Sequence, residues 1–323
     1  MYTPASILLL VIESVIWTAV VFSCAATVLG FGGHWLWQFE LASHFRVQYL
    51  FVLLLGALFL LGFQRYWGAV LAVCFALVNL YFFVLLYIPP DTAVKNVQNL
   101  RVISINVKAE NQKRKELFNL VHDSNPDFLV LFEVDKSWSA ASRELAQRFK
   151  YSRIFETSGY FSSAIFSRYP IRNVELKMFG RVSHYAMVVS LTVEGQAFYI
   201  IAAHTLAPTK SAYFQMRNSH LDSLASIARL LQGHVMLIGD LNLSTWSPYF
   251  DELIMTAGLN DSRRGFGVQA TWPVRYPLLR IPIDHCLTSP SININNWARG
   301  PDVGSDHFPV IVDFSIDGSA HQK

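Results

Sequence analysis

Three long apolar segments lie within the first 90 residues of this 323-residue chain, over 7–29, 49–63 and 68–88. A helix needs about 20 mainly apolar residues, with roughly 17–25 tolerated, to cross the hydrocarbon core of a bilayer. The first and third segments have this length, and the second needs its flanks. A cleaved signal peptide would explain one such segment but not three. We therefore expect residues 1–94 to form a membrane anchor of three transmembrane helices, rather than helices buried in a protein core.

The charges that flank these segments give little guidance on orientation. Arg46 precedes the second segment, Arg65 lies between the second and third, and Lys95 and Arg101 follow the third. Cytoplasmic loops are normally enriched in such residues, but here the two sides carry almost equal numbers. An odd number of spans places the N-terminus and the rest of the chain on opposite faces. We expect a multi-pass integral membrane protein whose larger domain faces outward.

The composition changes after Pro89-Pro90, because proline cannot continue the third helix. Residues 95–323 hold 24 of the 26 basic and 20 of the 23 acidic residues. This mild positive balance lacks the charge stripe of a dedicated nucleic-acid-binding protein. The three cysteines, Cys24, Cys74 and Cys286, have neither zinc-site nor C-x-x-C spacing.

Residues 95–323 alternate strand-like and helical patterns. We expect helices over 114–125 and 211–232, and strands over 101–107, 127–134, 162–168, 186–193, 197–204, 234–240, 283–289 and 309–316. The short connection Glu194-Gly195-Gln196 indicates a hairpin. This mixture favours a layered α/β sandwich with much antiparallel pairing over a doubly wound sheet.

Several of these strands end in side chains that could bind a metal or move a proton. They are Asn106, Glu133, His204, Asp240, Asn242, Asp284, Asp306 and His307. Each alone has an ordinary structural interpretation, such as a turn residue or a solvated carboxylate. Asp240 and Asn242 are one residue apart, so in an extended backbone they would point to the same side and reach one phosphate. The complete set favours a functional site.

The motifs that carry these residues are INVKAEN, LVLFEVD, AAHTLAP, GDLNLS, PIDHCL and GSDHFPV. Their order resembles the endonuclease/exonuclease/phosphatase superfamily, which includes DNase I-like nucleases, over about residues 100–316. Trp246-Ser247-Pro248 and Thr271-Trp272-Pro273 are similar to bacterial membrane-anchored members. The resemblance implies a DNase I-like four-layered α/β-sandwich over 95–323, preceded by the transmembrane helices and held in a bacterial inner membrane.

The resemblance also implies a metal-dependent phosphoester hydrolase. Asn106, Glu133 and Asp306 supply oxygen atoms of the kind that Mg²⁺ prefers, with Mn²⁺ as an alternative. Glu133 corresponds to the principal ligand. No covalent intermediate is expected.

The remaining positions match the family's catalytic groups. Asp240 corresponds to the residue that orients or deprotonates the attacking water, and Asn242 to the one that contacts the phosphate. His307 corresponds to the essential histidine, which Asp284 orients. His204 corresponds to a histidine that supports the phosphate or the leaving oxygen.

Several alternatives stay open at this point. The substrate is a phosphodiester or phosphomonoester, either a phospholipid headgroup at the bilayer or a nucleic acid, and no protein partner is inferred. A membrane scaffold without catalysis is the alternative from a different class. His285 is either a spare imidazole of the site or a strand residue. The segment 263–280, from Arg263 to Arg280, either contacts phosphate or is a solvated loop, and Arg168 is assigned to the fold.

Overall fold

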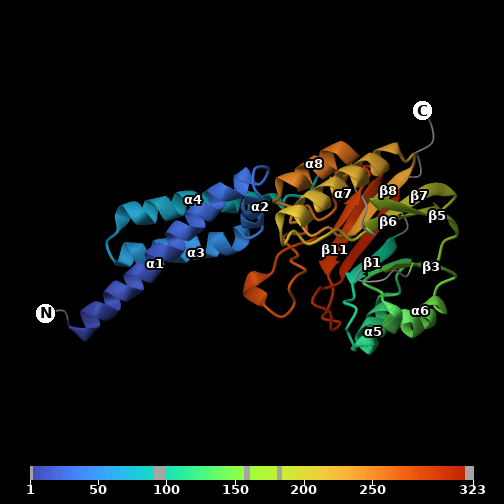
Figure 1. Cartoon of the computed structure of the whole chain (residues 1–323), viewed down its shortest axis with the longest axis horizontal. Helices are drawn as coiled ribbons and strands as arrows, with labels where there is room; N and C mark the ends of the chain where they lie inside the picture. Colours follow the sequence, from blue (N-terminus) through green and yellow to red (C-terminus); the bar gives the residue numbers. More distant parts are fainter. Residues whose placement is uncertain (1–2, 91–98, 156–160, 180–183, 317–323) are drawn as a thin grey trace.

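The computed structural model describes residues 3–90, 99–155, 161–179 and 184–316. Apolar helices form a bundle at one end, and a mixed α/β domain lies at the other (Figure 1). The boundary expected between residues 94 and 95 lies outside the described residues.

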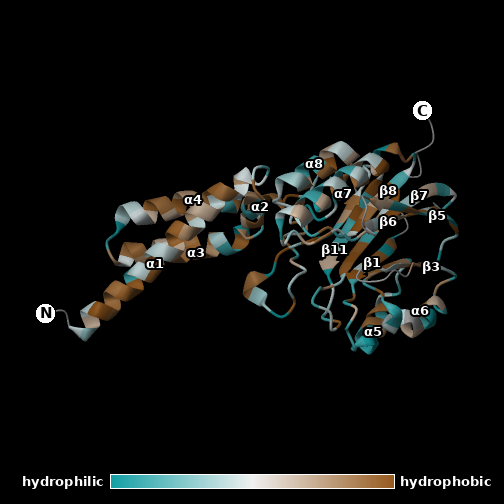
Figure 2. Cartoon of the chain, in the orientation of Figure 1, coloured by the Kyte–Doolittle hydropathy of each residue, from teal (hydrophilic) through white to brown (hydrophobic). Residues whose placement is uncertain are grey.

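The bundle consists of α1 (Pro4–Leu29), α3 (Arg46–Gly62) and α4 (Tyr66–Leu85), which coincide with the three expected apolar segments. The helix α1 and the helix α4 are each long and apolar enough to cross a membrane. A shorter helix, α2 (Trp37–Ser43), precedes α3 at an angle of 66°, and the two together could form a third span. Much of the outer surface of the bundle is apolar (Figure 2).

Small and polar residues hold the bundle together, and helix pairs within membranes pack in the same way. A Cβ atom added to Gly56 would lie 2.4 Å from the Val20 side chain, so glycine permits α1 and α3 to cross closely. Asn79 donates to the Thr27 hydroxyl at 2.9 Å. Glu13, the charge inside the first apolar segment, pairs with Arg65 at 2.6 Å.

The α/β domain contains two six-stranded sheets. The first has the order β11 (Ile292–Arg299), β12 (Val310–Ile316), β1 (Leu100–Asn106), β2 (Phe128–Phe132), β4 (Ser163–Ser167), β3 (Tyr151–Phe155). The second has the order β5 (Ile171–Phe179), β6 (His184–Val193), β7 (Gln196–Ala203), β8 (His234–Asp240), β10 (Asp284–Thr288), β9 (Asn260–Asp261). The β1–β2 and β7–β8 pairs are parallel, and the others are antiparallel.

The sheets pack face to face over an apolar core, in which the Phe198 ring stacks on Phe128 and Phe314 at 5.7 Å each. The helices α5 (Arg114–Ser124) and α6 (Ser139–Ala146) cover the outer face of the first sheet. The helices α7 (Ser211–Leu230) and α8 (Pro248–Ala257) cover the second. The expected four-layered α/β sandwich is therefore confirmed.

All eight expected strands are present, each with ends within two residues of the expected ones. The β6–β7 hairpin turns at Glu194-Gly195, both at positive φ, as a two-residue hairpin turn requires. The sequence did not predict β3, β5, β9, β11, α6 and α8. The strand β3 is at a sheet edge and β5 at the other sheet's edge, and neither has a fully buried residue. Such strands lack the apolar alternation that marks a half-buried strand.

Candidate active site

The carboxyl ends of two parallel strand pairs meet at the end of the sandwich that faces the helical bundle. Asn106 ends β1 and Glu133 follows β2, while His204 follows β7 and Asp240 ends β8. Together with His307 they line a cavity of about 470 Å³, a size typical of small-ligand sites.

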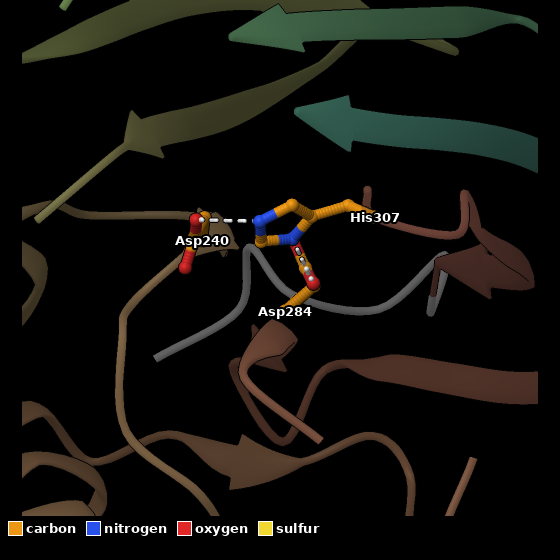
Figure 3. Close-up of side chains that lie close together, drawn as sticks. All are labelled: Asp240, Asp284 and His307. Atoms are coloured by element: carbon orange, nitrogen blue, oxygen red, sulfur yellow. Dashed lines mark hydrogen bonds and ion pairs between the residues drawn. The ribbon is translucent and has the colours of Figure 1, made fainter. Parts of the chain in front are cut away.

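His307 lies between two buried carboxylates (Figure 3). Its Nδ1 is 2.9 Å from Asp284 Oδ2, and its Nε2 is 3.6 Å from Asp240 Oδ2. Burial opposes a charge on the imidazole, but Asp284 and Asp240 outweigh it and raise the pKa of His307 to about 10. For Asp240 the effect of burial has the opposite sign, and it raises the pKa of this carboxyl to about 6. The raised pKa of His307 favours its imidazolium form at neutral pH.

The strand pairing fixes this arrangement. Asp284, the first residue of β10, pairs directly with Asp240 in the antiparallel register. Gly239 is required before Asp240, because an added Cβ would lie 2.0 Å from the Ala203 carbonyl oxygen and 2.7 Å from the Phe132 ring. Its φ of +145° also disfavours any side chain. The glycine thus lets β8 approach the end of β7 and presents Asp240 to the cavity.

Asn106 links the carboxylates of Glu133 and Asp240. Its Nδ2 donates to Glu133 Oε1 at 2.7 Å and to Asp240 Oδ2 at 3.3 Å. His204 Nε2 lies 3.5 Å from Asp240 Oδ2 and 3.9 Å from Glu133 Oε1. Glu133 has a φ of +59°, a conformation that is rare outside glycine and that clusters at functional sites. The structure therefore brings together Asn106, Glu133, His204 and Asp240.

Asn242 lines the cavity, but its backbone conformation differs from the expected one. Its φ is +50°, so the chain turns after β8 and is not extended. The Asn242 N–H donates to Asp240 Oδ1 at 3.0 Å, and its Nδ2 donates to the Thr205 carbonyl at 2.9 Å. The alternation argument for Asp240 and Asn242 was wrong, because local hydrogen bonds of the aspartate close a turn there. Both residues nevertheless line the cavity.

Asp306 stands apart from this group. Its side chain is 42% exposed, and its Oδ2 lies 4.0 Å from Lys108 Nζ. It is not among the residues that line the cavity, although the adjacent His307 is.

Two groups of side chains could be considered for a metal ion. Ligand atoms of Asp240, Asp284 and His307 lie within 4.8 Å of one another. Nδ1 of His307 is already bonded to Asp284, however, so one of its two ring nitrogens is occupied. Glu133 and Asn106 instead carry oxygen atoms, the donors that Mg²⁺ prefers while it keeps several waters. Here Asn106 turns its Nδ2 toward Glu133 and its Oδ1 toward the Lys108 N–H, so its amide would have to rotate to present the oxygen to an ion. The donor chemistry of this second group fits the expected ion.

Two questions that the sequence left open have structural answers. His285 is a buried strand residue, not part of the cavity lining: its Nε2 donates to the Leu243 carbonyl at 2.8 Å. Burial and the nearby Arg263 hold its pKa well below the usual value, so it is neutral. Arg263 itself is fully buried, donating to the Asp284 carbonyl at 2.5 Å and lying over the Trp297 ring. This arginine is neither solvated nor available to a phosphate.

The sequence analysis missed the contribution of the N-terminal helices. Leu41 and His44, from α2 and its C-terminal end, line the cavity together with Thr205, Phe161 and Trp272. His44 Nδ1 lies 2.9 Å from the Ser244 hydroxyl, in the loop that follows Asn242. The available signal was the pair Glu40 and His44, one helical turn apart between two apolar segments.

A fully buried ion pair reinforces this contact. Arg217 on α7 donates to Glu40 Oε1 at 3.2 Å and to the Asn242 carbonyl at 3.0 Å. Ser247 donates to the same Glu40 oxygen at 2.7 Å. The charge pair thus connects α2 to the backbone of a residue that lines the cavity.

The motif Trp246-Ser247-Pro248 forms the rest of this contact. Trp246 Nε1 donates to the Phe82 carbonyl on α4 at 3.4 Å. Ser247 caps α8 and bonds Glu40, and the Pro248 ring packs near Gly33. Each residue of the motif therefore contacts the N-terminal helical region.

Comparison with known proteins agrees with the fold. The sequence profile of the Endonuclease/Exonuclease/phosphatase family matches residues 96–307, about two thirds of the chain. The chain belongs to this family, whose members are typically metal-dependent phosphoester hydrolases. No curated protein sequence matches the chain at a significant level.

Solved structures share the sandwich at low sequence identity. D. rerio TDP2 complexed with single-strand DNA product is 18% identical with a TM-score of 0.59, covering 68% of this chain and 100% of that one. The human Nocturnin catalytic domain with bound sulfate is 18% identical with a TM-score of 0.57, covering 68% and 95%. A family protein from Bacteroides thetaiotaomicron is 16% identical with a TM-score of 0.57, covering 70% and 98%. At these identities the likeness concerns the fold alone.

Proposed function

We propose that the protein is a membrane-anchored, Mg²⁺-dependent phosphoesterase. The observation that carries the proposal is the His307 imidazole, held between Asp284 and Asp240 beside a cavity that Glu133 and Asn106 also line. Hydrolysis of a phosphate ester needs an acceptor for the proton of water and positive support for the phosphoryl oxygens. Asp240 is the acceptor and His307 the positive group, and both line the same cavity.

Each residue has a role that follows from its environment. Asp240 accepts the proton of the attacking water, because burial gives its carboxylate an unusually high pKa for an aspartate. His307 places a positive charge at the phosphate, and Asp284 holds its ring in position. The amide of Asn242 and the imidazole of His204 bind phosphoryl or leaving-group oxygens.

Glu133 and Asn106 would hold the Mg²⁺ ion, whereas Asp306, the third expected ligand, is 42% exposed and does not line the cavity. The ion supplies positive charge to the phosphoryl oxygens when it is bound. The Asn106 Nδ2 bonds to Glu133 and Asp240 keep the two carboxylates side by side before the ion binds.

Membrane anchoring is supported by aromatic side chains at both ends of the bundle. Trp67 is 87% exposed where α4 begins, and Trp35 is 81% exposed in the connection between α1 and α2. Tryptophan is enriched at the two membrane–water interfaces. The 20 residues of α4 correspond to about 30 Å, the thickness of the hydrocarbon core. The α/β domain then lies at one surface of the bilayer.

A hydrolysis assay tests the enzyme proposal directly. Full-length protein in detergent is expected to hydrolyse bis(4-nitrophenyl) phosphate with Mg²⁺ and to lose that activity in EDTA. Restoring Mg²⁺ should restore it. If protein with an intact unfolding transition shows no metal-dependent turnover, the alternative of an inactive scaffold is correct.

Orientation is tested separately. The outward-facing placement of the α/β domain predicts that protease added outside sealed right-side-out vesicles removes a C-terminal tag. A tag that is cleaved only in inverted vesicles would place the domain in the cytoplasm.

A further inference from the structure

The walls of the catalytic cavity are mainly apolar beyond the polar groups described above. They include Leu41, Leu206, Ala207, Pro208, Ile281 and Ile283. Among the described residues that line it, none is lysine or arginine. Proteins that follow a nucleic-acid backbone neutralise successive phosphates with such residues. The cavity therefore suits a phosphate attached to an apolar group better than a polyanion.

A second, apolar cavity of about 640 Å³ lies between α1, α2 and α3. Its walls include Phe22, Ala26, Phe45 and Val52, and its polar lining residues are uncharged. We call it the helix groove. It lies on the helices that are apolar enough to enter a bilayer, with α2 and α3 as the bent pair.

The helix groove and the catalytic cavity share a wall. Leu41 lines both of them. Leu279 lines the helix groove and Ile281 lines the catalytic cavity, two residues further along the same segment. Between them, the Arg280 carbonyl accepts a hydrogen bond from Gln48 of α3 at 2.9 Å. The two spaces are therefore neighbours, with Leu41 between them.

The segment that closes this wall exposes apolar side chains between Arg275 and Arg280, and it projects from the α/β domain on the side of the bundle (Figure 1). Leu278 is 85% exposed, and Tyr276 and Leu279 are each 53% exposed. An exposed apolar group of this kind marks a contact with a membrane or another protein. Here the hydrogen bond between Gln48 and the Arg280 carbonyl attaches it to a candidate membrane helix, which favours the membrane.

We propose that the substrate is a lipid phosphate ester, whose phosphate enters the catalytic cavity while its hydrocarbon chain lies in the helix groove. The proposal rests on the phosphoesterase function proposed above and names its substrate class. A lipid that diffuses in the bilayer enters the groove from the side and needs no basic residues at the cavity. Burial of the chain supplies binding energy next to the reacting phosphate.

The test uses two reporter esters with the same leaving group, ethyl 4-nitrophenyl phosphate and dodecyl 4-nitrophenyl phosphate. Full-length protein in lipid nanodiscs is assayed with Mg²⁺, and the ratio of kcat/KM for the dodecyl ester over the ethyl ester is measured. We expect a ratio of at least about 100 for the wild type, because each methylene group that leaves water for an apolar phase favours binding. The groove variants then show whether that phase is the helix groove or the bilayer.

Two valines on the apolar helices provide a matched comparison. Val52 lines the helix groove, whereas Val70 on α4 is 54% exposed and is not among the groove-lining residues. Val52→Trp should fill the groove and lower the ratio at least about tenfold, by removing buried hydrocarbon contacts. Val70→Trp should leave it within about twofold of wild type, since exposed substitutions away from a site have small effects. Ala25→Trp, on the α1 wall of the groove, should repeat the loss.

The outcomes separate the two proposals. Equal ratios in the Val52→Trp and Val70→Trp proteins, or a wild-type ratio near one, would overturn the lipid assignment while leaving the phosphoesterase intact. Failure of folded protein to hydrolyse either ester would overturn the phosphoesterase itself.

Discussion

The two pKa shifts at the centre of the cavity give the site a defined pH dependence. Asp240 must be ionised to accept a proton, and burial raises its pKa to about 6. His307 must be protonated, and its two carboxylate neighbours raise its pKa to about 10 against the effect of burial. We expect kcat/KM at saturating Mg²⁺ to fall below about pH 6 and again above about pH 10.

The residue Asp284 permits a control for this profile. Asp284→Asn keeps an acceptor for Nδ1 but removes a negative charge that raises the pKa of His307. The alkaline limb should therefore move to lower pH. Asp240→Asn and His307→Ala should each reduce kcat by about 10²–10⁴ at every pH, the usual contribution of acid–base groups. An unchanged alkaline limb in Asp284→Asn would remove His307 from the assignment.

Gly239 is expected to be intolerant of any side chain. In Gly239→Ala the new methyl group would meet the Ala203 carbonyl oxygen at 2.0 Å, in a backbone conformation that alanine disfavours. We expect a loss of more than about 1 kcal/mol in the free energy of unfolding, measured by chemical denaturation. Gly195→Ala is the control, because its φ is also positive but nothing lies within 4 Å. Equal losses in both variants would show that the close approach of β8 and β7 is unimportant.

For single residues, the sequence predicts which side chains line the cavity better than it predicts their backbone conformation and contacts. Asp240 and Asn242 were both expected at one cavity, and both line it, but the expected extended backbone is replaced by a turn at Asn242. Alternation is a property of a strand, and the strand ends at Asp240. The Asn106–Glu133 contact joins residues 27 positions apart and depends on the parallel pairing of β1 and β2, which residue types alone do not specify.

At the scale of elements, α2 is the element near the cavity that the sequence pattern did not predict. Its seven residues are too few for a periodic pattern, and Glu40 makes the segment look like a polar connection. The helix is stabilised by Arg217, 177 positions away, which buries its guanidinium against the Glu40 carboxylate. Long apolar helices and alternating strands are encoded locally, whereas this helix is stabilised by a tertiary contact.

The Glu40–Arg217 pair should therefore behave as a buried ion pair. Glu40→Gln leaves a buried guanidinium without its counter-charge, which typically costs about 3–5 kcal/mol. We expect a clearly lower midpoint of thermal unfolding, followed by intrinsic tryptophan fluorescence in detergent. The double variant Glu40→Gln, Arg217→Met removes both charges and should recover part of the loss. A double variant no more stable than Glu40→Gln would contradict a direct coupling of the two charges.

At the scale of the whole molecule, the helical bundle and the sandwich share an extensive contact. Trp246 bonds the α4 backbone, and the N–H groups of Gly265 and Gly267 both donate to the Leu86 carbonyl, at 2.9 and 3.0 Å. Added Cβ atoms at these glycines would meet Pro89 and Tyr87. The glycines of the segment 263–280 thus serve to bring the end of α4 onto the domain. The N-terminal helices are part of the cavity wall as well as a candidate anchor.

This contact predicts how the chain responds to truncation. A protein beginning at residue 95 lacks Glu40, His44 and Leu41, so Arg217 loses its counter-charge and one wall of the cavity is missing. We expect a lower unfolding midpoint and a reduced kcat/KM even on the small soluble diester, not restored by adding lipid. A deletion that ends at residue 12, which leaves α2 and the end of α4 in place, should keep both properties. If the truncated domain matched the full-length protein in stability and in turnover of the soluble diester, the helices would act as a tether alone, and the role assigned here to α2 in completing the cavity would be wrong.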